Sequence, residues 1–244
     1  MGVFLFYGRA IDSTVLTALN TIAETQSKPT AQTMAHTLHL LDYLDTHPDA
    51  TIEYKASGMH LWIDTDAAYL VAPRARSRVA GFYYLSDKPQ TPTQSHPPLN
   101  GAIFIECKIL KNTVSSAAES ETGGVFHNCQ NAIPFRRTLE ELGHPQHATP
   151  IKTDNSTSAG FCNQTIKEKR SKSWDMRYHW IRDKIGDKTV TIYWAPGTQN
   201  LADYFTKHHS PIHHRRIRYK YLHDPVEAAL NNMMTLLAET APSA

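Results

Sequence analysis

Hydrophobic and polar positions follow two different periods along this chain, and the period changes near residue 50. Between residues 29 and 46, apolar residues recur at near-helical spacing, which predicts an amphipathic helix with Met34, Leu38, Leu41 and Leu44 on its buried face. An Ala/Leu-rich segment over about residues 12–24 predicts a second helix. After Thr51, β-branched and aromatic residues gather in short runs separated by turn residues, which predicts strands. These runs cover residues 51–55, 59–70, 78–86 and 101–110.

Three sequential strands joined by turns and by the proline-rich loop 88–100 indicate an antiparallel meander. A long helix is then predicted over about residues 115–142, ended by Gly143. Gly123 and Gly124 lie inside it, where each costs ~1 kcal/mol relative to alanine. They indicate either close packing of the helix against the sheet or local decay of the sequence.

The last third of the predicted domain alternates short strands with helices. A buried strand ends at Asp154, and Asn155 or Ser156 can cap the helix that follows. A further helix, a fifth strand and a helix near Asn200 come next, and a short helix is predicted in the tail. These elements cover residues 173–185 (with Trp174, Tyr178 and Ile181 on one face), 190–194, 200–207 and 226–238. The order β-β-β-α-β-α-β-α predicts an α/β fold with a mixed sheet.

Composition places the chain among globular proteins. Its 244 residues are 41% hydrophobic and 20% charged, which suits one domain with an appendage or two small domains. Cys107, Cys129 and Cys162 are too few and too scattered for a disulfide framework, so we expect a reducing compartment, cytoplasmic or nuclear, and buried thiols. The chain contains no membrane-length apolar run, and its start is a poor signal peptide.

Charge is distributed unevenly, and the uneven part suggests a polyanion partner. Residues 165–220 hold thirteen basic and five acidic side chains, although the whole chain carries a net charge of only +2. Within this stretch, basic residues are predicted to contact the nucleic-acid backbone, namely Lys167, Lys169, Arg170 and Lys172. Thr153, Asn155 and Ser156 can donate to the same backbone, although helix capping is the alternative role for one of them.

Four acidic residues stand at strand ends or helix starts that one mixed sheet would bring together: Asp66, Glu121, Asp154 and Asp203. Each alone is more often structural than catalytic, so the set carries the inference. Four converging carboxylates cannot all stay ionised without a positive partner. Oxygen-only ligation favours Mg²⁺, and a pair of such ions ~3.5–4 Å apart can activate water against a phosphodiester. Asp64 shares a strand face with Asp66, because side chains alternate along a strand.

Several segments in combination resemble the ribonuclease H domain that closes the polyprotein of Ty1/copia-type retrotransposons: TDAAY, IKTDNSTSAG, RYHWIRD and PGTQNLADYFTKHH. The resemblance covers about residues 30–222. It implies an RNase H-like fold, a mixed five-stranded sheet with helices on both faces, preceded by a helical tether. It assigns residues 1–50 to the end of the reverse transcriptase, 51–222 to the nuclease domain and 223–244 to a C-terminal helix or tail. The polymerase's paired-aspartate motif is absent, so we expect no DNA synthesis.

The resemblance also implies an activity, the hydrolysis of RNA in RNA–DNA hybrids with two Mg²⁺ ions, for which Mn²⁺ can substitute. Asp66 would bridge both ions, Glu121 and Asp154 would hold one with the attacking water, and Asp203 would complete the other. Asp64 and Glu119 are the alternative ligands. Here Thr122-Gly123-Gly124 follow Glu121, where the family has a bulky residue.

The implied partners are the hybrid and the polymerase portion of the same polyprotein, and no membrane is expected. The alternative is an inactive retroelement remnant that binds nucleic acid without cleaving it. Of the histidine pairs 208–209 and 213–214, one member of the first can stand near the metal centre as a proton shuttle. A zinc site at these pairs is disfavoured, because neighbouring residues on a helix cannot face one ion.

Overall fold

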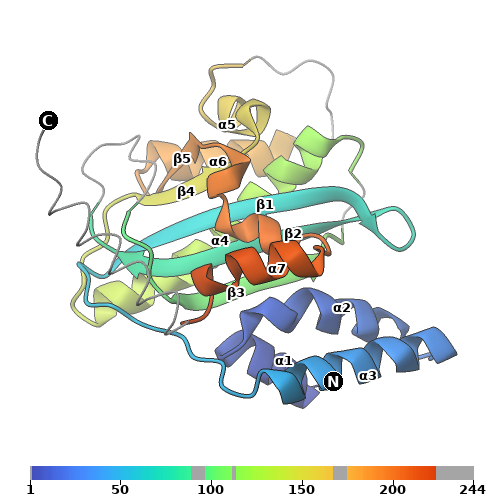
Figure 1. Ribbon diagram of the computed structural model, residues 1–244. Coiled ribbons are helices and arrows are strands. Elements are labelled where there is room, and N and C mark those ends of the chain that lie inside the picture. Colours follow the sequence, from blue (N-terminus) through green and yellow to red (C-terminus); the bar gives the residue numbers. More distant parts are fainter. Residues whose placement is uncertain (1, 89–96, 112–113, 167–174, 224–244) are drawn as a thin grey trace, which may run out of the picture.

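A twisted five-stranded sheet forms the centre of the protein (Figure 1). The computed structural model describes residues 2–88, 97–111, 114–166 and 175–223. The strands are β1 (His60–Ala72), β2 (Arg76–Ser86), β3 (Ala102–Ile109), β4 (Thr149–Thr153) and β5 (Val190–Trp194). Their spatial order is β3-β2-β1-β4-β5. The first three strands pair antiparallel as a meander, and β4 and β5 join β1 in parallel, which confirms the mixed sheet expected of an RNase H-like fold.

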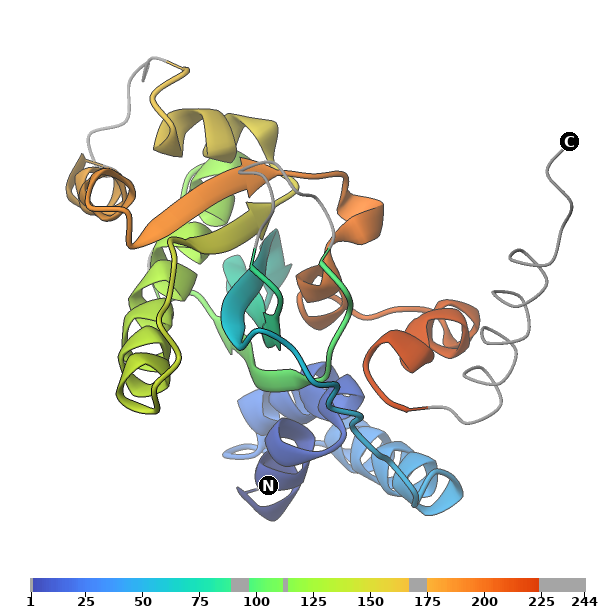
Figure 2. The ribbon, with the colours of Figure 1, turned by 90° about the vertical axis from the view of Figure 1, so that its left-hand side faces the viewer.

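Helices cover both faces of this sheet (Figure 2). The helices on one face are α4 (Ala117–Glu141), α5 (Ser156–Cys162) and α6 (Asp175–Gly186). The opposite face carries α1 (Gly2–Ala10), η1 (Ser13–Val15), α2 (Leu16–Thr25), α3 (Ala31–Thr46), η3 (Leu201–Phe205), α7 (Pro211–Ile217) and η4 (Arg218–Lys220), and the short turn η2 (Gly197–Gln199) precedes η3. Within the described part of the chain, no helix has both the length and the apolar character that a membrane crossing needs.

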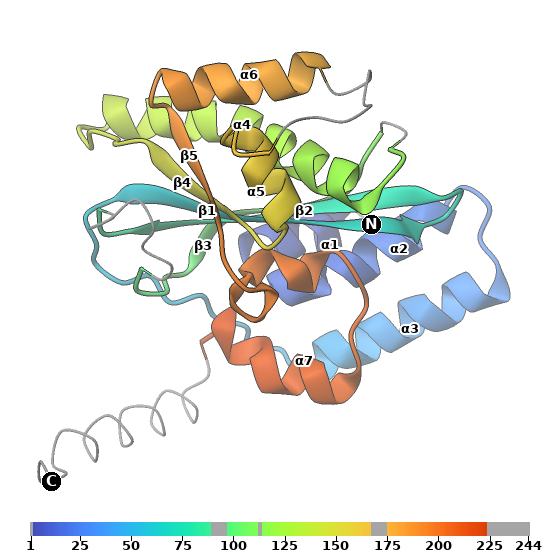
Figure 3. The same cartoon turned by 90° about the horizontal axis from the view of Figure 1, so that it is seen from above.

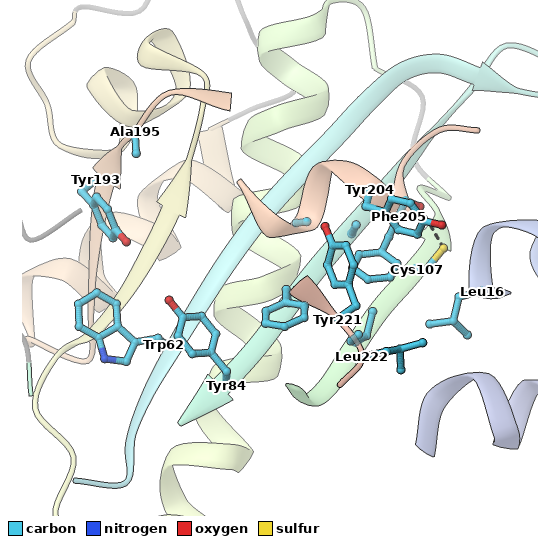
Figure 4. Packing of buried hydrophobic residues seen from close by; sticks show 14 residues of the cluster. Leu16, Trp62, Tyr84, Cys107, Tyr193, Ala195, Tyr204, Phe205, Tyr221 and Leu222 are labelled. Carbon is cyan, nitrogen blue, oxygen red and sulfur yellow. Dashed lines mark hydrogen bonds between the residues drawn. The ribbon is translucent and has the colours of Figure 1, made fainter. Parts of the chain in front are cut away.

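Alternation along β1 divides the core into two layers. Leu61 and Ile63 point toward α4, where they join a cluster around Ile151. Trp62 points the other way, into a cluster that includes Phe82, Phe205 and Tyr221 (Figure 4). Phe82 and Tyr221 lie edge to face with ring centroids 5.8 Å apart, an arrangement that aromatic pairs prefer. The second cluster therefore holds η3 and the segment after α7 against the sheet.

The long helix α4 crosses the sheet at the predicted glycines. Ser116 caps its start by accepting from the Glu119 backbone N–H, and Gly143 follows its end with a φ of +88°. A Cβ on Gly124 would lie 3.2 Å from Val79 and 3.3 Å from Ala67. The glycine therefore allows the helix to approach β1 and β2 more closely than any other residue would. Close packing, the first of the two explanations offered above, accounts for Gly124.

Helix α3 forms where the sequence predicts it, but a different face is buried. Met34, Leu38 and Leu41 are exposed, whereas Leu40 is buried and packs with α2 residues that include Leu19. The predicted buried face was wrong, because the side of α3 that contacts α2 is the one that contains Thr33 and Leu40. Of the four predicted residues, Leu44 packs against this cluster. An apolar pattern indicates a helix, but the neighbouring helix decides which side is covered.

A few other expectations differ from the structure. Residues 51–55 form no strand, although the Glu53 carbonyl accepts a hydrogen bond from the Gly101 N–H. The helix expected over 200–207 is the 3₁₀ turn η3. Tyr178 and Ile181 are buried on α6 as predicted. Trp174, most of the proline-rich loop and the helix expected over 226–238 lie outside the described residues.

Substitution of the adjacent glycines is expected to have opposite effects on stability. Gly124→Val is expected to lower the free energy of unfolding by about 1–3 kcal/mol, because the side chain overpacks against Val79 and Ala67. Gly123→Ala is expected to raise it by about 1 kcal/mol, since its new Cβ would meet only Leu110 at 3.7 Å and alanine favours the helix. Urea unfolding of both variants measures the difference, and losses of equal size would contradict the close approach at Gly124.

Candidate active site

Asp66 lies in the middle of β1, on the face that η3 covers. Its side chain is buried, and one carboxylate oxygen accepts a hydrogen bond of 2.6 Å from the Thr206 hydroxyl. Asp64 lies two residues earlier and accepts from the Leu201 backbone N–H at 2.9 Å. Both aspartates therefore face η3, as their spacing on the strand predicts.

Asp154 and Asp203 meet Asp66 at this place. Each of the three offers a carboxylate oxygen, and these oxygens lie within 4.8 Å of one another. Asp154 directly follows β4, which pairs in parallel with β1. Asp203 lies on η3, whose N-cap residue Asn200 donates through its side-chain amide to the Thr65 carbonyl at 2.9 Å. Sheet pairing thus brings Asp154 into place, and the Asn200 bond ties the segment with Asp203 to β1.

Glu121 approaches the three aspartates from the other helical layer. It lies near the start of α4 and is buried, and burial and then the charges of Asp66 and Asp154 raise its pKa well above the ordinary value. It is not part of the 4.8 Å set. Its Oε2 atom is buried and finds no hydrogen-bond partner among the residues that the structure describes. A buried carboxylate oxygen without a donor is expensive, and a cation is the partner that would satisfy it.

Burial, and after it like charge, disfavours the ionised form of the acids in this cluster. Burial raises the pKa of Asp66 to about 7, the Thr206 hydrogen bond opposes the rise, and the charges of Asp154 and Asp203 add to it. Burial and then the charge of Asp203 also raise the pKa of Asp154. The donor set is entirely carboxylate, which fits a hard divalent cation such as Mg²⁺ better than a soft metal.

Lys207 is the cation that lies at the cluster. Its ammonium group pairs with Asp203 at 2.5 Å across a turn of chain, and about half of the lysine side chain is exposed. Partial burial alone would lower the pKa of Lys207, but the hydrogen bond to Asp203 and the negative charges of the cluster raise it. The lysine therefore stays charged and offsets part of the repulsion.

The two alternative acids have other partners. Asp64 forms a buried ion pair of 2.6 Å with Lys152 on β4, and Lys152 also donates to the Gln199 carbonyl at 2.6 Å. Glu119 accepts from the backbone N–H and the hydroxyl of Ser115, so it secures the start of α4. The geometry therefore favours Asp66 over Asp64, and Glu121 over Glu119, as members of the acidic cluster.

Sequence reasoning missed Lys152, Thr206 and Asn200, which hold the acids in place. A signal existed for Lys152, since a lysine in the middle of a short buried strand needs a charged partner. The roles of Thr206 and Asn200 depend on how η3 folds back over β1, which no local pattern reveals.

The predicted nucleic-acid contacts divide into three groups. Thr153 is fully buried on the short strand β4, which is covered on both faces, and this burial argues against its predicted contact with nucleic acid. Asn155 accepts from the Ser158 backbone N–H at 2.9 Å and caps α5, whereas Ser156 is exposed. The basic residues Lys167, Lys169, Arg170 and Lys172 lie outside the described residues.

The histidine pairs serve packing and hydrogen bonding. His208 contacts the Thr21 hydroxyl on α2 at 3.0 Å. The ring of His209 stacks on Tyr204, the neighbour of Asp203, with centroids 5.0 Å apart. Among the described His, Cys, Asp and Glu residues, the only group of three or more close enough to hold a metal is Asp66, Asp154 and Asp203. All three cysteines are free and buried, as expected.

Known relatives of this chain are retrotransposon polyproteins. No family model matches it. Over 107 residues, 44% of the chain, it is 29% identical to the retrovirus-related Pol polyprotein from transposon TNT 1-94 of Nicotiana tabacum. Over 217 residues, 85% of the chain, it is 23% identical to the Gag-Pol polyprotein of transposon Ty1-LR3 of Saccharomyces cerevisiae. The chain spans only 8% and 11% of the length of these two relatives.

Structural comparison returns RNase H domains. The N-terminal RNase H domain of Rv2228c from Mycobacterium tuberculosis matches 61% of this chain and 91% of its own, at 11% identity and a TM-score of 0.43. The prototype foamy virus RNase H domain matches 63% of this chain and 93% of its own, at 14% identity and a TM-score of 0.40.

The sheet order and the acidic cluster define an α/β protein of the RNase H-like class. Within that class, the chain resembles the RNase H domain of Ty1/copia-type retrotransposon polyproteins, and the relatives confirm the resemblance given by its motifs.

In the absence of divalent cations, the free energy of unfolding is expected to fall as pH rises from about 4 to about 7. The pKa of Asp66 is about 7 in the folded protein against an ordinary value of 3.8, so folding favours its neutral form. The corresponding stability is present at low pH and is lost as pH rises through about 7. Asp154→Asn removes one like charge and is expected to reduce this loss, whereas Asp183→Asn on the exposed side of α6 is not. Melting temperatures in a chelator across this pH range measure the effect, and identical curves for all three proteins would refute it.

The buried and exposed lysines are expected to differ sharply in their effect on stability. Lys152→Met leaves Asp64 buried without its ion-pair partner and is expected to cost about 3–5 kcal/mol. Lys207→Met removes a half-exposed pair and is expected to cost at most about 1 kcal/mol. Urea unfolding at pH 7.5 compares the two variants, and similar losses would show that the Asp64–Lys152 pair is not a structural requirement.

Proposed function

We propose that this protein hydrolyses the RNA strand of RNA–DNA hybrids in a divalent-metal-dependent reaction, as part of retrotransposon reverse transcription. The observation that carries the proposal is the set of three carboxylate oxygens, from Asp66, Asp154 and Asp203, that lie within 4.8 Å of one another. The resemblance to retrotransposon polyproteins supports the choice of substrate. One of the solved structures similar in fold is described as an RNase H1 in complex with an RNA/DNA hybrid.

Two Mg²⁺ ions, for which Mn²⁺ can substitute, are the proposed cofactors. Asp66, Asp154 and Asp203 would hold them, together with Glu121, whose buried and unpaired Oε2 fits the need for a cation. When bound, such ions activate a water and stabilise the leaving oxygen of a phosphodiester.

The remaining residues of the site orient the acids. Thr206 fixes the rotamer of Asp66 through its 2.6 Å hydrogen bond, and Asn200 ties the turn that carries Asp203 to β1. Lys152 pairs with Asp64 and so neutralises a further negative charge near Asp66. These contacts hold the carboxylates close together before any ligand arrives, which is the preorganisation that catalysis requires.

The proposed partners are the hybrid and the polymerase portion of the same polyprotein. We assign residues 1–50 to the end of that polymerase portion and residues 51–222 to the nuclease domain. This boundary rests on the resemblance of the motifs.

Replacement of single acids by amides is expected to abolish hydrolysis. Asp66→Asn and Asp154→Asn should each lower the rate of Mg²⁺-dependent cleavage of a labelled hybrid by about 100-fold or more, because each removes a charged ligand from the cluster. Glu140→Gln at the exposed end of α4 makes a similar change far from the cluster and should leave the rate unchanged.

Cleavage and binding assays on the variants and on the wild type distinguish a nuclease from an inactive remnant that binds nucleic acid. Cleavage that survives in both aspartate variants would refute the proposed catalytic set. Tight binding of the hybrid with no cleavage at any Mg²⁺ or Mn²⁺ concentration would instead identify a remnant that binds nucleic acid without acting on it.

A further inference from the structure

One face of α7 and the following turn η4 is exposed and carries two arginines. Ile212, Arg215, Arg216 and Tyr219 follow the spacing i, i+3, i+4, i+7, so they form one stripe along the helix. All four are exposed to solvent, Ile212 by 75% and Tyr219 by 40%. We call these four residues the α7 stripe.

The opposite face of α7 is fixed to the rest of the protein. His214 lies between two phenol groups, with its Nδ1 2.6 Å from the Tyr204 hydroxyl and its Nε2 3.0 Å from the Tyr43 hydroxyl. Arg218 donates to the same Tyr43 hydroxyl at 3.3 Å. Because Tyr43 belongs to α3 and Tyr204 to η3, these bonds set the orientation of α7, which lies beside α3 (Figure 3). The α7 stripe is therefore held outward on a rigid support.

Positive and titratable groups connect the acidic cluster to the α7 stripe. Lys207 pairs with Asp203 at the cluster itself. His209 follows two residues later, and its ring stacks on that of His213 with centroids 4.5 Å apart. The Nδ1 atom of His213 lies 3.4 Å from the guanidinium of Arg216. Contacts and chain neighbours thus lead from the carboxylates to Arg216.

The segment that forms this path contains no opposing charge. Residues 204–223 include five lysines or arginines and five histidines, but no aspartate or glutamate. A cluster of carboxylates repels any phosphate that approaches it, so a protein that brings a polyanion to such a cluster needs counter-charge beside it. The described residues supply that charge here, on the segment that directly follows Asp203.

We infer that the α7 stripe binds the backbone phosphates of the nucleic acid whose RNA strand reaches the acidic cluster. This inference rests on the proposed function and names a contact surface for its substrate. Arg215 and Arg216 present planar guanidinium groups, which suit phosphate oxygens. Tyr219 and Ile212 flank them and offer apolar contact to sugars or bases. An acidic protein is the competing partner, but it would give no reason for the stripe to lie on the segment that follows Asp203.

The test measures the affinity for a fluorescent RNA–DNA hybrid as a function of salt. All proteins carry Asp154→Asn to suppress cleavage, and the magnesium concentration is held constant while KCl is varied. Arg215→Gln with Arg216→Gln is expected to weaken binding by about tenfold to a hundredfold at 0.1 M salt and to lower the slope of log affinity against log salt by about 2. Arg215→Lys with Arg216→Lys keeps both charges and should retain most of the slope.

A matched control separates a local contact from a general loss of positive charge. Arg137→Gln with Lys188→Gln also removes two positive charges, both at exposed positions. These positions lie near the start of β4 and β5, whereas Asp154 lies at the end of β4. This control should leave both affinity and slope unchanged. Equal losses in the control and in the α7 variant would overturn the inference, as would an α7 variant that binds the hybrid like its parent. Melting temperatures confirm that each variant is folded.

Failure of this inference can be told apart from failure of the proposed function. If the wild type cleaves the hybrid but the α7 variant binds normally, the function stands and the inference is wrong. If the wild type never cleaves but the α7 variant loses affinity and slope, the stripe is a nucleic-acid surface on a protein that lacks the activity. Polyglutamate serves as a probe for an acidic protein partner. If the α7 variant loses binding to polyglutamate but still binds the hybrid, the stripe binds an acidic protein and the inference is overturned.

Discussion

The gathering of several carboxylates at one buried or half-buried place is the constraint around which this structure is built. Asp66, Asp154 and Asp203 come from three separate elements, and Glu121 approaches from a fourth. Brought together in a low-dielectric place, these groups oppose the fold that collects them, as the raised pKa values of Asp66 and Glu121 indicate. Such an arrangement persists only when stronger interactions elsewhere enforce it, and that is characteristic of functional sites.

The enforcing interactions are distributed over both layers of the core. On one side, Gly124 lets α4 approach the sheet, which positions the beginning of that helix and Glu121 with it. On the other side, aromatic packing around Phe205 holds η3 against the sheet, and the Asn200 amide fixes its first residue. Neither layer alone would assemble the cluster, since each contributes acids that the other does not.

Much of the fold was predictable from the sequence, because strand alternation and helix signals are local. The meander, the long helix capped near Ser116 and the strand that ends at Asp154 all follow from residue patterns. The buried side of α3 did not follow, since Leu40 and Leu41 are equally apolar and only contact with α2 distinguishes them. For the site, residue type and position predicted the convergence of four acids, of which three aspartates form the 4.8 Å set and Glu121 does not belong to it. The partnership of Asp64 with Lys152 required the register between β1 and β4, which is a property of the folded sheet.

The bonds that α2 makes with β2 and η3 bear on where the nuclease domain begins. Arg78 on β2 is almost fully buried and pairs with Glu24 of α2 at 3.0 Å, and the Thr17 hydroxyl donates to the Phe205 carbonyl at 3.2 Å. Excision of the chain at residue 51 would remove the partners of that guanidinium and the hydrogen bond from Thr17 to Phe205, which belongs to the same turn as Asp203. Helix α2 therefore acts as a buttress of the RNase H-like sheet, and a boundary drawn at residue 51 divides a continuous set of contacts.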